Sequence, residues 1–295
     1  MLAVELPIGR APVSFDTTTT PSTEDAEECV RARRDLARAK DRVPEARQRM
    51  GHRRWNVVVN APGPMERRNS KKTVVNRAYH KMHEILLTCV LPRTTRSLHL
   101  CEAPGGFVQC VSEHLANKEW TWMMVTLPAE DIAPSSCLPH DRGSVVLGDV
   151  FHGVQHAEDA SFDLVTADGA VEMDHARLEE SHRPLLVAQC RVAFRCLSAG
   201  GTFVVKFFEG LEYDTRRVIA WISNRFEFTS IIKPTSSRPT NSERYLVCRK
   251  FIGDASDTDW NDVRTCNTWD RALQTVVTRL ANTQSNALGR VTASV

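Results

Sequence analysis

Four charged residues stand beside predicted strands or on a predicted helix, and their types suit proton handling or the stabilisation of developing negative charge. Asp168 follows the apolar run F-D-L-V-T-A, and Lys206 ends the run G-G-T-F-V-V. Glu243 stands just before Tyr245–Cys248, and Lys81 lies in a stretch with apolar residues at three- and four-residue spacing. A lone lysine is costly to bury, so Lys206 needs a partner or a task. The structural alternative is a simple ion pair with Asp168 or Glu243.

A glycine-containing turn, E-A-P-G-G-F at 102–107, joins a predicted strand to a predicted helix. Glycines let a ligand approach the backbone closely, and a helix N-terminus favours an anionic group. The turn lacks the G-x-G-x-x-G fingerprint, so a nicotinamide enzyme is poorly supported. Taken alone, it is either a cofactor loop or a plain connection.

The elements that must position these residues alternate between strand and helix. Strands are expected at Ser97–Cys101, Thr121–Leu127, Val145–Leu147, Phe162–Ala167, Thr202–Phe207, Phe226–Ile232 and Tyr245–Cys248. Helices are expected at Phe107–Asn117 and at Pro184–Leu197, the latter stopped by Gly200 and Gly201. This alternation predicts an α/β fold with a mostly parallel sheet, helices on both faces and an antiparallel edge strand. Ligands bind such sheets at the carboxyl ends of the strands, where the charged residues collect.

Taken together, the motifs resemble those of the FtsJ-like (RrmJ-type) ribose 2′-O-methyltransferases. N-R-A-Y-H-K-M-H-E-I, L-V-T-A-D-G, G-G-T-F-V-V-K and N-S-E-R-Y-L-V follow one another in the family's order within residues 76–248. The resemblance implies a Rossmann-like methyltransferase fold, S-adenosylmethionine as cofactor and RNA as substrate. It also implies a catalytic tetrad of Lys81, Asp168, Lys206 and Glu243. The cofactor contacts that it implies are Glu102, Ala103, Pro104, Gly105, Gly106, Phe107, Thr126, Leu127, Asp149, Val150 and Asp168.

Within the family, L-C-E-A-P-G-G-F, a Trp-x-Trp strand and K-P-T-S-S-R are most similar to the cap-specific mRNA branch. That likeness implies methylation of a cap-proximal nucleotide of mRNA. The bacterial ribosomal branch has an aspartate where this chain has His99, and another where it has Thr126-Leu127. Two alternatives stay open: a ribosomal or transfer RNA 2′-O-methyltransferase, and a non-catalytic RNA-binding subunit with the same fold. Whether Lys206 acts as a neutral base or as a cation that stabilises the alkoxide also stays open.

The net charge of +2 hides an uneven distribution. Between Arg31 and Arg77 there are 15 basic and 4 acidic residues, a local balance of +11 that leaves −9 for the rest. A basic segment beside an acidic remainder suggests a polyanionic partner, although a solvated arm has the same composition. The residues expected to contact RNA phosphates are Arg53, Arg54, Arg67, Arg68, Lys71, Lys72 and Arg77.

Four regions are expected along the chain. They are a disordered lead-in (1–23), a basic N-terminal arm (24–70), the methyltransferase domain (71–252) and a polar C-terminal extension with a possible helix (253–295). Within the arm, W-N-V-V-V predicts a short strand followed by a loop. No metal site, membrane span or secretory signal is expected, and nine cysteines without C-x-x-C spacing favour an intracellular setting, nucleus or cytoplasm.

Overall fold

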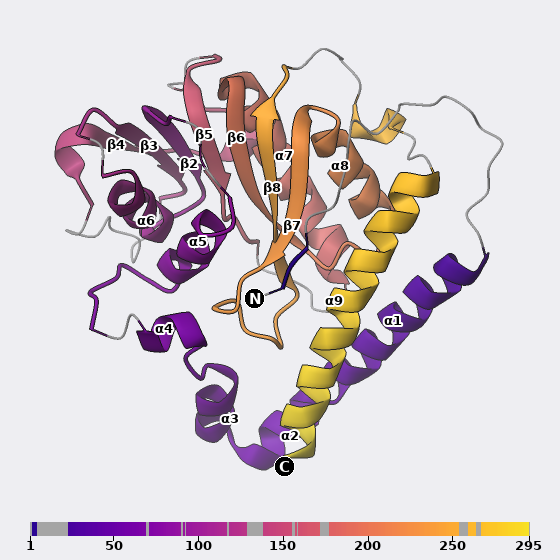
Figure 1. Cartoon of the computed structure of the whole chain (residues 1–295). Coiled ribbons are helices and arrows are strands. Elements are labelled where there is room, and N and C mark those ends of the chain that lie inside the picture. Colours follow the sequence, from indigo (N-terminus) through magenta and orange to yellow (C-terminus); the bar gives the residue numbers. More distant parts are fainter. Residues whose placement is uncertain are drawn as a thin grey trace.

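An eight-stranded sheet forms the centre of the molecule in a computed structural model (Figure 1). The structure describes residues 2–4, 23–68, 71–89, 91, 93–116, 118–128, 138–154, 157, 159–171, 177–253, 259–263 and 267–294. The strands are β1 (Leu2–Val4), β2 (Arg96–Leu100), β3 (Thr121–Thr126), β4 (Gly143–Leu147), β5 (Phe162–Ala167), β6 (Leu197–Phe208), β7 (Phe226–Lys233) and β8 (Glu243–Phe251). Their spatial order is β1-β7-β8-β6-β5-β2-β3-β4.

The strands from β2 to β6 pair in parallel, whereas β8 is antiparallel to both β6 and β7. The expected mostly parallel sheet with an antiparallel pair is therefore confirmed. The antiparallel strand β8 lies inside the sheet, between β7 and β6. Strand β1 forms the edge of the sheet and pairs antiparallel with β7. Because β7 and β8 are joined directly by the loop 234–242, this loop lies at the same edge as the carboxyl end of β6.

Helices cover both faces of the sheet, as the alternation predicted. The helices are α1 (Thr23–Asp41), α2 (Val43–Met50), α3 (His52–Val59), α4 (Pro64–Arg68), α5 (Ala78–Leu86), α6 (Gly106–Leu115), α7 (Leu178–Cys196), α8 (Tyr213–Ser223) and α9 (Asn267–Ala293). The 3₁₀ turns are η1 (His140–Arg142), η2 (Val150–His152) and η4 (Trp260–Asp262). No helix of the described residues is long and apolar enough to cross a bilayer.

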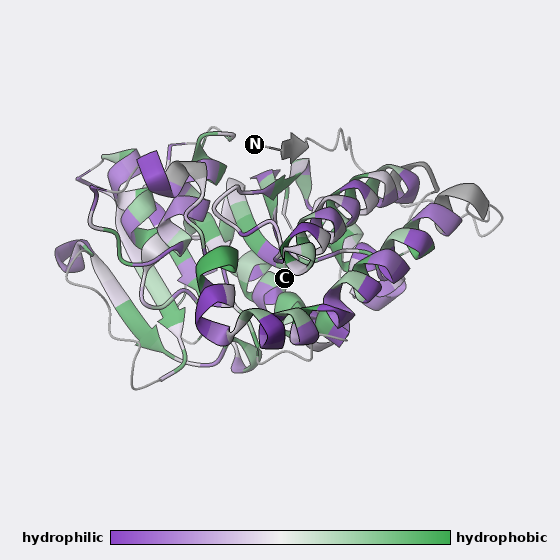
Figure 2. Ribbon diagram, turned by 90° about the horizontal axis from the view of Figure 1, so that it is seen from below, coloured by the Kyte–Doolittle hydropathy of each residue, from purple (hydrophilic) through white to green (hydrophobic). Residues whose placement is uncertain are grey.

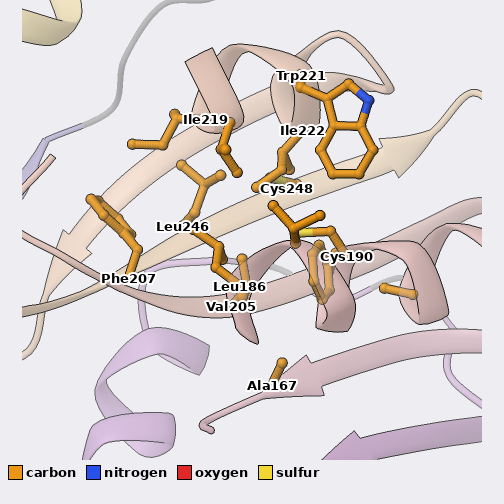
Figure 3. Packing of buried hydrophobic residues seen from close by; sticks show 14 of the residues in the cluster. Ala167, Leu186, Cys190, Val205, Phe207, Ile219, Trp221, Ile222, Leu246 and Cys248 are labelled. Carbon is orange, nitrogen blue, oxygen red and sulfur yellow. The ribbon is translucent and has the colours of Figure 1, made fainter. Parts of the chain in front are cut away.

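The side chains of each strand point alternately to the two faces of the sheet, and each face carries its own apolar core. Val204 and Tyr245 pack with the residues of α5 and α6 on one face. Val205 and Leu246 point to the other face, where they pack with α7 and α8 (Figure 3). Successive side chains of a strand point to opposite faces, so every second residue of β6 and β8 reaches the α5 side. This parity decides which charged residues of these strands can meet.

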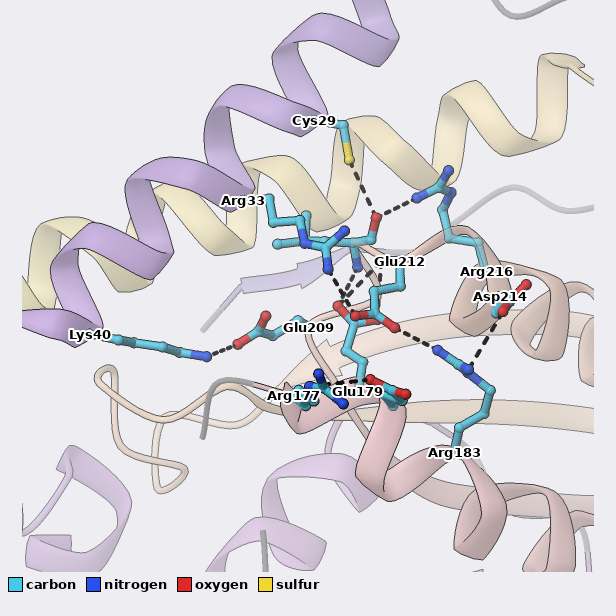
Figure 4. A network of polar contacts seen from close by, with 12 residues as sticks. Cys29, Arg33, Lys40, Arg177, Glu179, Arg183, Glu209, Glu212, Asp214 and Arg216 are labelled. Carbon is cyan, nitrogen blue, oxygen red and sulfur yellow. Dashed lines mark hydrogen bonds and ion pairs between the residues drawn. The ribbon is translucent and has the colours of Figure 1, made fainter. Parts of the chain in front are cut away.

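The N-terminal helix α1 and the C-terminal helix α9 lie side by side (Figures 1 and 2). Leu36 of α1 and Val277 of α9 are buried in the same core as α7 and α8. Arg33 of α1 also bonds Glu212 at 2.9 Å, and Lys40 bonds Glu209 (Figure 4). The basic arm is thus fixed to the sheet domain along α1.

Three local expectations need correction. The W-N-V-V-V run is wrong as a strand: it lies in helix α3, where only Trp55 is buried and Val57 is 68% exposed. A helix satisfies its own backbone hydrogen bonds, whereas a strand here would need a neighbour to pair with. Helix α7 ends at Cys196, before the glycines at 200 and 201, which belong to β6. Within the expected lead-in, Leu2–Val4 pairs with β7, and residues 5–22 lie outside the described part.

Candidate active site

Four charged side chains from distant parts of the chain meet on the α5 side of the sheet. Lys206 is in register with Tyr245 across β6 and β8, so both point to the face that carries α5. Asp168 directly follows β5, whose last residue pairs with Val205, and it therefore lies beside Lys206. Glu243 begins β8 on the same parity as Tyr245, and Lys81 approaches from α5.

Measured distances connect all four groups. Lys81 Nζ lies 2.9 Å from the Glu243 carboxylate, and Lys206 Nζ lies 3.0 Å from Asp168 Oδ1. Lys206 Nζ also lies 3.9 Å from Glu243 Oε2 and donates to the main-chain oxygen of Asp168 at 2.6 Å. The structure therefore brings the four residues expected from the sequence into one chain of alternating charge.

Burial and charge act in opposite directions on this group. Burial disfavours the ammonium form of Lys206, but the carboxylates of Asp168 and Glu243 outweigh it and raise the pKa of Lys206. Burial likewise disfavours the Glu243 carboxylate, but Lys81 and Lys206 outweigh it and lower the pKa of Glu243. In the free protein, Lys206 is therefore a cation at neutral pH.

The loop that precedes Glu243 is held from two sides. Glu84, one helical turn after Lys81 on α5, accepts hydrogen bonds from the Thr235 and Ser236 amides at 2.6 and 2.8 Å. Lys233 donates to the main-chain oxygens of Asn241 and Glu243, each at 2.7 Å. Burial lowers the pKa of Lys233 to about 7. These contacts fix the distance between the helix that carries Lys81 and the strand that carries Glu243.

The glycine turn lies at the carboxyl end of β2, in a conformation that few side chains tolerate. Gly105 has φ 109°, and Cys101, just before the turn, has φ 57°. The expected contacts here differ in access: the Glu102 carboxyl is buried against His99 and Thr166, and Phe107 is fully buried. Burial raises the pKa of Glu102. The Glu102 side chain therefore faces the protein and not a ligand, and Phe107 supports the turn from within the core.

Exposed apolar side chains cluster along the next two strand ends. Leu127 directly follows β3 and is 54% exposed. Leu147 is the last residue of the neighbouring strand β4 and is 65% exposed. Phe151 in η2 is 52% exposed, and its amide donates to Asp149 Oδ1 at 2.9 Å. Large apolar groups left in water at one edge, beside a carboxylate acceptor, fit the adenosine of S-adenosylmethionine. Val150 and Thr126 are buried, the latter accepting a bond from the Gly148 amide on its carbonyl.

The residues expected to contact RNA divide into accessible cations and cations with protein partners. Arg53 and Arg54 on α3 are exposed, as are Arg67, Arg68 and Lys71. Lys72 is paired with Glu113 and with the hydroxyl of Tyr79. Arg77 is half-buried against Glu66 at 2.7 Å. The last two residues expected to contact RNA thus already have protein partners.

Sequence reasoning missed Tyr245 and Lys233. Tyr245 is fully buried and donates its hydroxyl to Asp168 Oδ1 at 2.8 Å. The signal was its position two residues after Glu243, which on a strand places both side chains on one face. Among the described residues, no group of three or more His, Cys, Asp or Glu side chains is arranged to hold a metal ion.

Comparison with known proteins identifies the family of this chain. Residues 74–251, more than half of the chain, match the model of the FtsJ-like methyltransferase family. The cap-specific mRNA (nucleoside-2′-O-)-methyltransferase 2 of Drosophila melanogaster is 28% identical over 247 residues, which cover 70% of this chain and 35% of the relative.

Two further relatives carry different names. The cap-specific mRNA (nucleoside-2′-O-)-methyltransferase of Autographa californica nuclear polyhedrosis virus is 39% identical over 88 residues, 29% of this chain and 34% of the relative. The AdoMet-dependent rRNA methyltransferase SPB1 of Mycosarcoma maydis is 29% identical over 157 residues, 52% of this chain and 16% of the relative. The matched part of this chain spans about a third or less of the length of these relatives.

Proposed function

Because the chain belongs to the FtsJ-like methyltransferase family, whose cofactor is S-adenosylmethionine, we propose that it methylates a ribose 2′-oxygen of RNA. The observation that carries this proposal is the buried chain of alternating charge from Lys81 to Asp168, at the carboxyl ends of the strands. In this proposal residues 71–252 form the methyltransferase domain, and 24–70 and 253–295 are extensions that complete its RNA-binding edge.

The chemistry of the site follows from the acceptor. S-adenosylmethionine supplies a methyl group that is already activated by its sulfonium sulfur. A ribose hydroxyl is a poor nucleophile, so the protein must hold it in line and stabilise charge on its oxygen. Orientation of this kind is worth roughly 7–11 kcal/mol in favourable cases. As the new carbon–oxygen bond forms and the carbon–sulfur bond breaks, the hydroxyl proton leaves to solvent.

Each tetrad residue has a distinct task in this mechanism. Lys206, a buried cation, directs its ammonium at the 2′-oxygen and stabilises the negative charge that develops there. Asp168 and Glu243 hold that ammonium in place, because their carboxylates lie 3.0 and 3.9 Å from Lys206 Nζ. Lys81 balances the charge of Glu243 and orients it. This arrangement needs no neutral lysine in the free protein.

The target that we propose is a cap-proximal nucleotide of mRNA. Two of the relatives carry cap-specific names, and the chain shares with that branch the motifs around the glycine turn and the loop 234–242. A ribosomal or transfer RNA target is the second candidate, favoured by the relative named as an rRNA methyltransferase.

A methyl-transfer assay separates these candidates. The full chain is incubated with radiolabelled S-adenosylmethionine and with matched transcripts that carry a cap, a 5′-triphosphate or a 5′-hydroxyl, and the product is mapped by nuclease digestion. We expect label on a 2′-oxygen near the 5′ end of the capped transcript only. Equal labelling of all three transcripts would exclude the cap assignment. No labelling of any RNA, with S-adenosylmethionine bound, would favour the non-catalytic subunit.

A further inference from the structure

A cavity of about 560 Å³ adjoins the tetrad but includes none of its residues. Its walls are the loop 234–242, the arm segment 58–63 with Arg67, and the last turns of α9. Lys233 lines the cavity and bonds the main chain of Glu243, so the two sites share a wall. A volume of this size falls in the range of about 300–1,000 Å³ that is usual for small-ligand pockets.

The rim of this cavity carries a group of arginines, of which Arg77 is paired with Glu66. Arg67, Arg77, Arg238 and Arg290 all contribute to its lining. Among the residues that the structure describes, Arg238 and Arg290 have no carboxylate partner. Burial, with the nearby charge of Arg77, lowers the pKa of Arg238. Guanidinium groups gathered in this way suit phosphate groups, which they bind through paired hydrogen bonds.

Two buried polar side chains add a second, independent observation. Arg244 is 1% exposed, and within the described part of the chain its Nη2 has no acceptor. Gln284 of α9 is 4% exposed, and its Oε1 has no donor there, although its Nε2 donates to Thr240 O and Ser242 Oγ. Both residues line the cavity. A buried polar atom without a partner is costly, so a donor and an acceptor left without partners in the wall of one cavity favour a ligand that offers both. The protein covers both atoms, so each meets a ligand only when its side chain turns toward the cavity.

The remaining lining is a mixture of aliphatic and polar residues. Val58, Leu280, Ala287 and Val291 supply hydrophobic surface, and none of the described lining residues is aromatic. Such a pocket cannot sandwich a base between aromatic rings. It can bury a base against aliphatic carbon and bond the polar edge of that base.

We propose that this cavity binds one nucleotide of the RNA, next to the nucleotide that is methylated. Arg238 and Arg290 hold its phosphates, and the side chains of Arg244 and Gln284 turn toward its base to bond the edge through Nη2 and Oε1. The C-terminal helix α9 thereby becomes part of the RNA-binding surface. That the ligand is RNA rests on the proposed function. The residues from which the cavity is inferred lie outside the tetrad.

Nucleotide binding tests the cavity directly. The full chain, saturated with S-adenosylhomocysteine, is titrated calorimetrically with GTP, ATP and 7-methyl-GTP. We expect binding of at least one triphosphate, weakened about tenfold in the double variant Arg238→Ala/Arg290→Ala and in Gln284→Met. Arg279→Ala, an exposed arginine of α9 outside the cavity, is the matched control and should bind as the wild type does. Because no aromatic ring is available to stack on a cationic base, GTP and 7-methyl-GTP should bind within about threefold of each other.

The outcomes separate the cavity from the catalytic proposal. Unchanged affinity in both variants, or a 7-methyl-GTP affinity more than tenfold above that of GTP, would overturn the cavity inference even where methyl transfer is active. Binding that the variants weaken, in a chain that methylates no RNA, would leave the cavity standing and remove the catalytic proposal. Since Arg290 is exposed, its replacement is not expected to unfold the protein, and thermal unfolding of each variant checks this.

Discussion

Tyr245 donates its hydroxyl to Asp168 Oδ1 at 2.8 Å, the same carboxylate oxygen that lies 3.0 Å from Lys206 Nζ. A buried neutral donor and a buried cation therefore share one acceptor. The hydroxyl fixes the orientation of the carboxylate, and the carboxylate fixes the ammonium. Tyr245 is thus a positioning residue, and its effect on methyl transfer acts through Asp168.

Replacement of Lys206 by alanine is expected to lower kcat for methyl transfer by at least a hundredfold, because it removes the cation next to the 2′-oxygen. Binding of S-adenosylmethionine, measured by calorimetry, should persist. Lys250→Ala, on the exposed end of β8, is the control and should keep its activity. Retained turnover in the Lys206 variant would remove this residue from the mechanism.

Replacement of Tyr245 by phenylalanine is expected to lower kcat about five- to tenfold, the effect of losing one orienting hydrogen bond. The KM for RNA should stay unchanged, since the hydroxyl faces Asp168 and not the substrate. Tyr213→Phe, at an exposed tyrosine, provides the comparison. A raised KM with normal kcat would contradict a positioning role.

The pH dependence of kcat tests the charge of Lys206. The carboxylates of Asp168 and Glu243 outweigh its burial and raise its pKa, so the ammonium persists across neutral pH. We expect kcat to be nearly flat from pH 7 to 9 when RNA and S-adenosylmethionine are saturating. A rise of about tenfold per pH unit over that range would instead indicate catalysis by a small neutral fraction of Lys206.

Stability should depend on pH through Glu179, which lies on α7 and is buried against the turn before α8 (Figure 4). Burial, with the charge of Glu209, raises the pKa of Glu179 from 4.5 to about 7. A carboxyl whose folded pKa is raised contributes stability below pH 4.5, and this contribution is lost as pH rises through about 7.

Urea unfolding at pH 5 and pH 8 measures this effect. The wild type should lose unfolding free energy from pH 5 to pH 8 because Glu179 ionises. In Glu179→Gln this loss should be smaller by ~2 kcal/mol. Glu180→Gln, at an exposed neighbour, should leave the pH difference as it is. An equal pH dependence in wild type and Glu179→Gln would show that the carboxyl titrates normally.

The basic arm should supply salt-dependent RNA affinity. Replacing Arg53, Arg54 and Lys71 by alanine is expected to raise the Kd for RNA and to reduce the slope of log Kd against log salt by about two, since each phosphate contact on single strands contributes about 0.7. Binding of S-adenosylmethionine should not change. A double Arg93→Ala/Lys118→Ala variant, at exposed cations outside the arm, is the control. An unchanged salt slope in the triple variant would mean that the arm is merely solvated.

The sequence by itself determined the order of the strands from β2 to β8 and the four charged residues of the site. Apolar runs of strand length and turn residues depend on local chemistry, so the strands appeared at the expected places, usually within a residue or two. Local propensity failed at W-N-V-V-V, because β-branched residues favour a strand only where another strand is available for pairing. Lys81, Asp168, Lys206 and Glu243 were recognised as one set through their motifs.

Only the tertiary structure decided what these residues do to one another. The charge of Lys206 depends on the balance between its burial and the attraction of two carboxylates. To judge this balance one needs the distances from Lys206 Nζ to both carboxylates, which the spacing of the residues along the chain does not give. The same holds for Tyr245 on Asp168 and for Glu84 beneath the loop 234–242, more than 70 residues apart in each case. The cavity between that loop, the arm and α9 joins three segments whose sequences show no common motif. The donor on Arg244 and the acceptor on Gln284 lack partners because packing removes water from both side chains without supplying a partner in the described part of the chain.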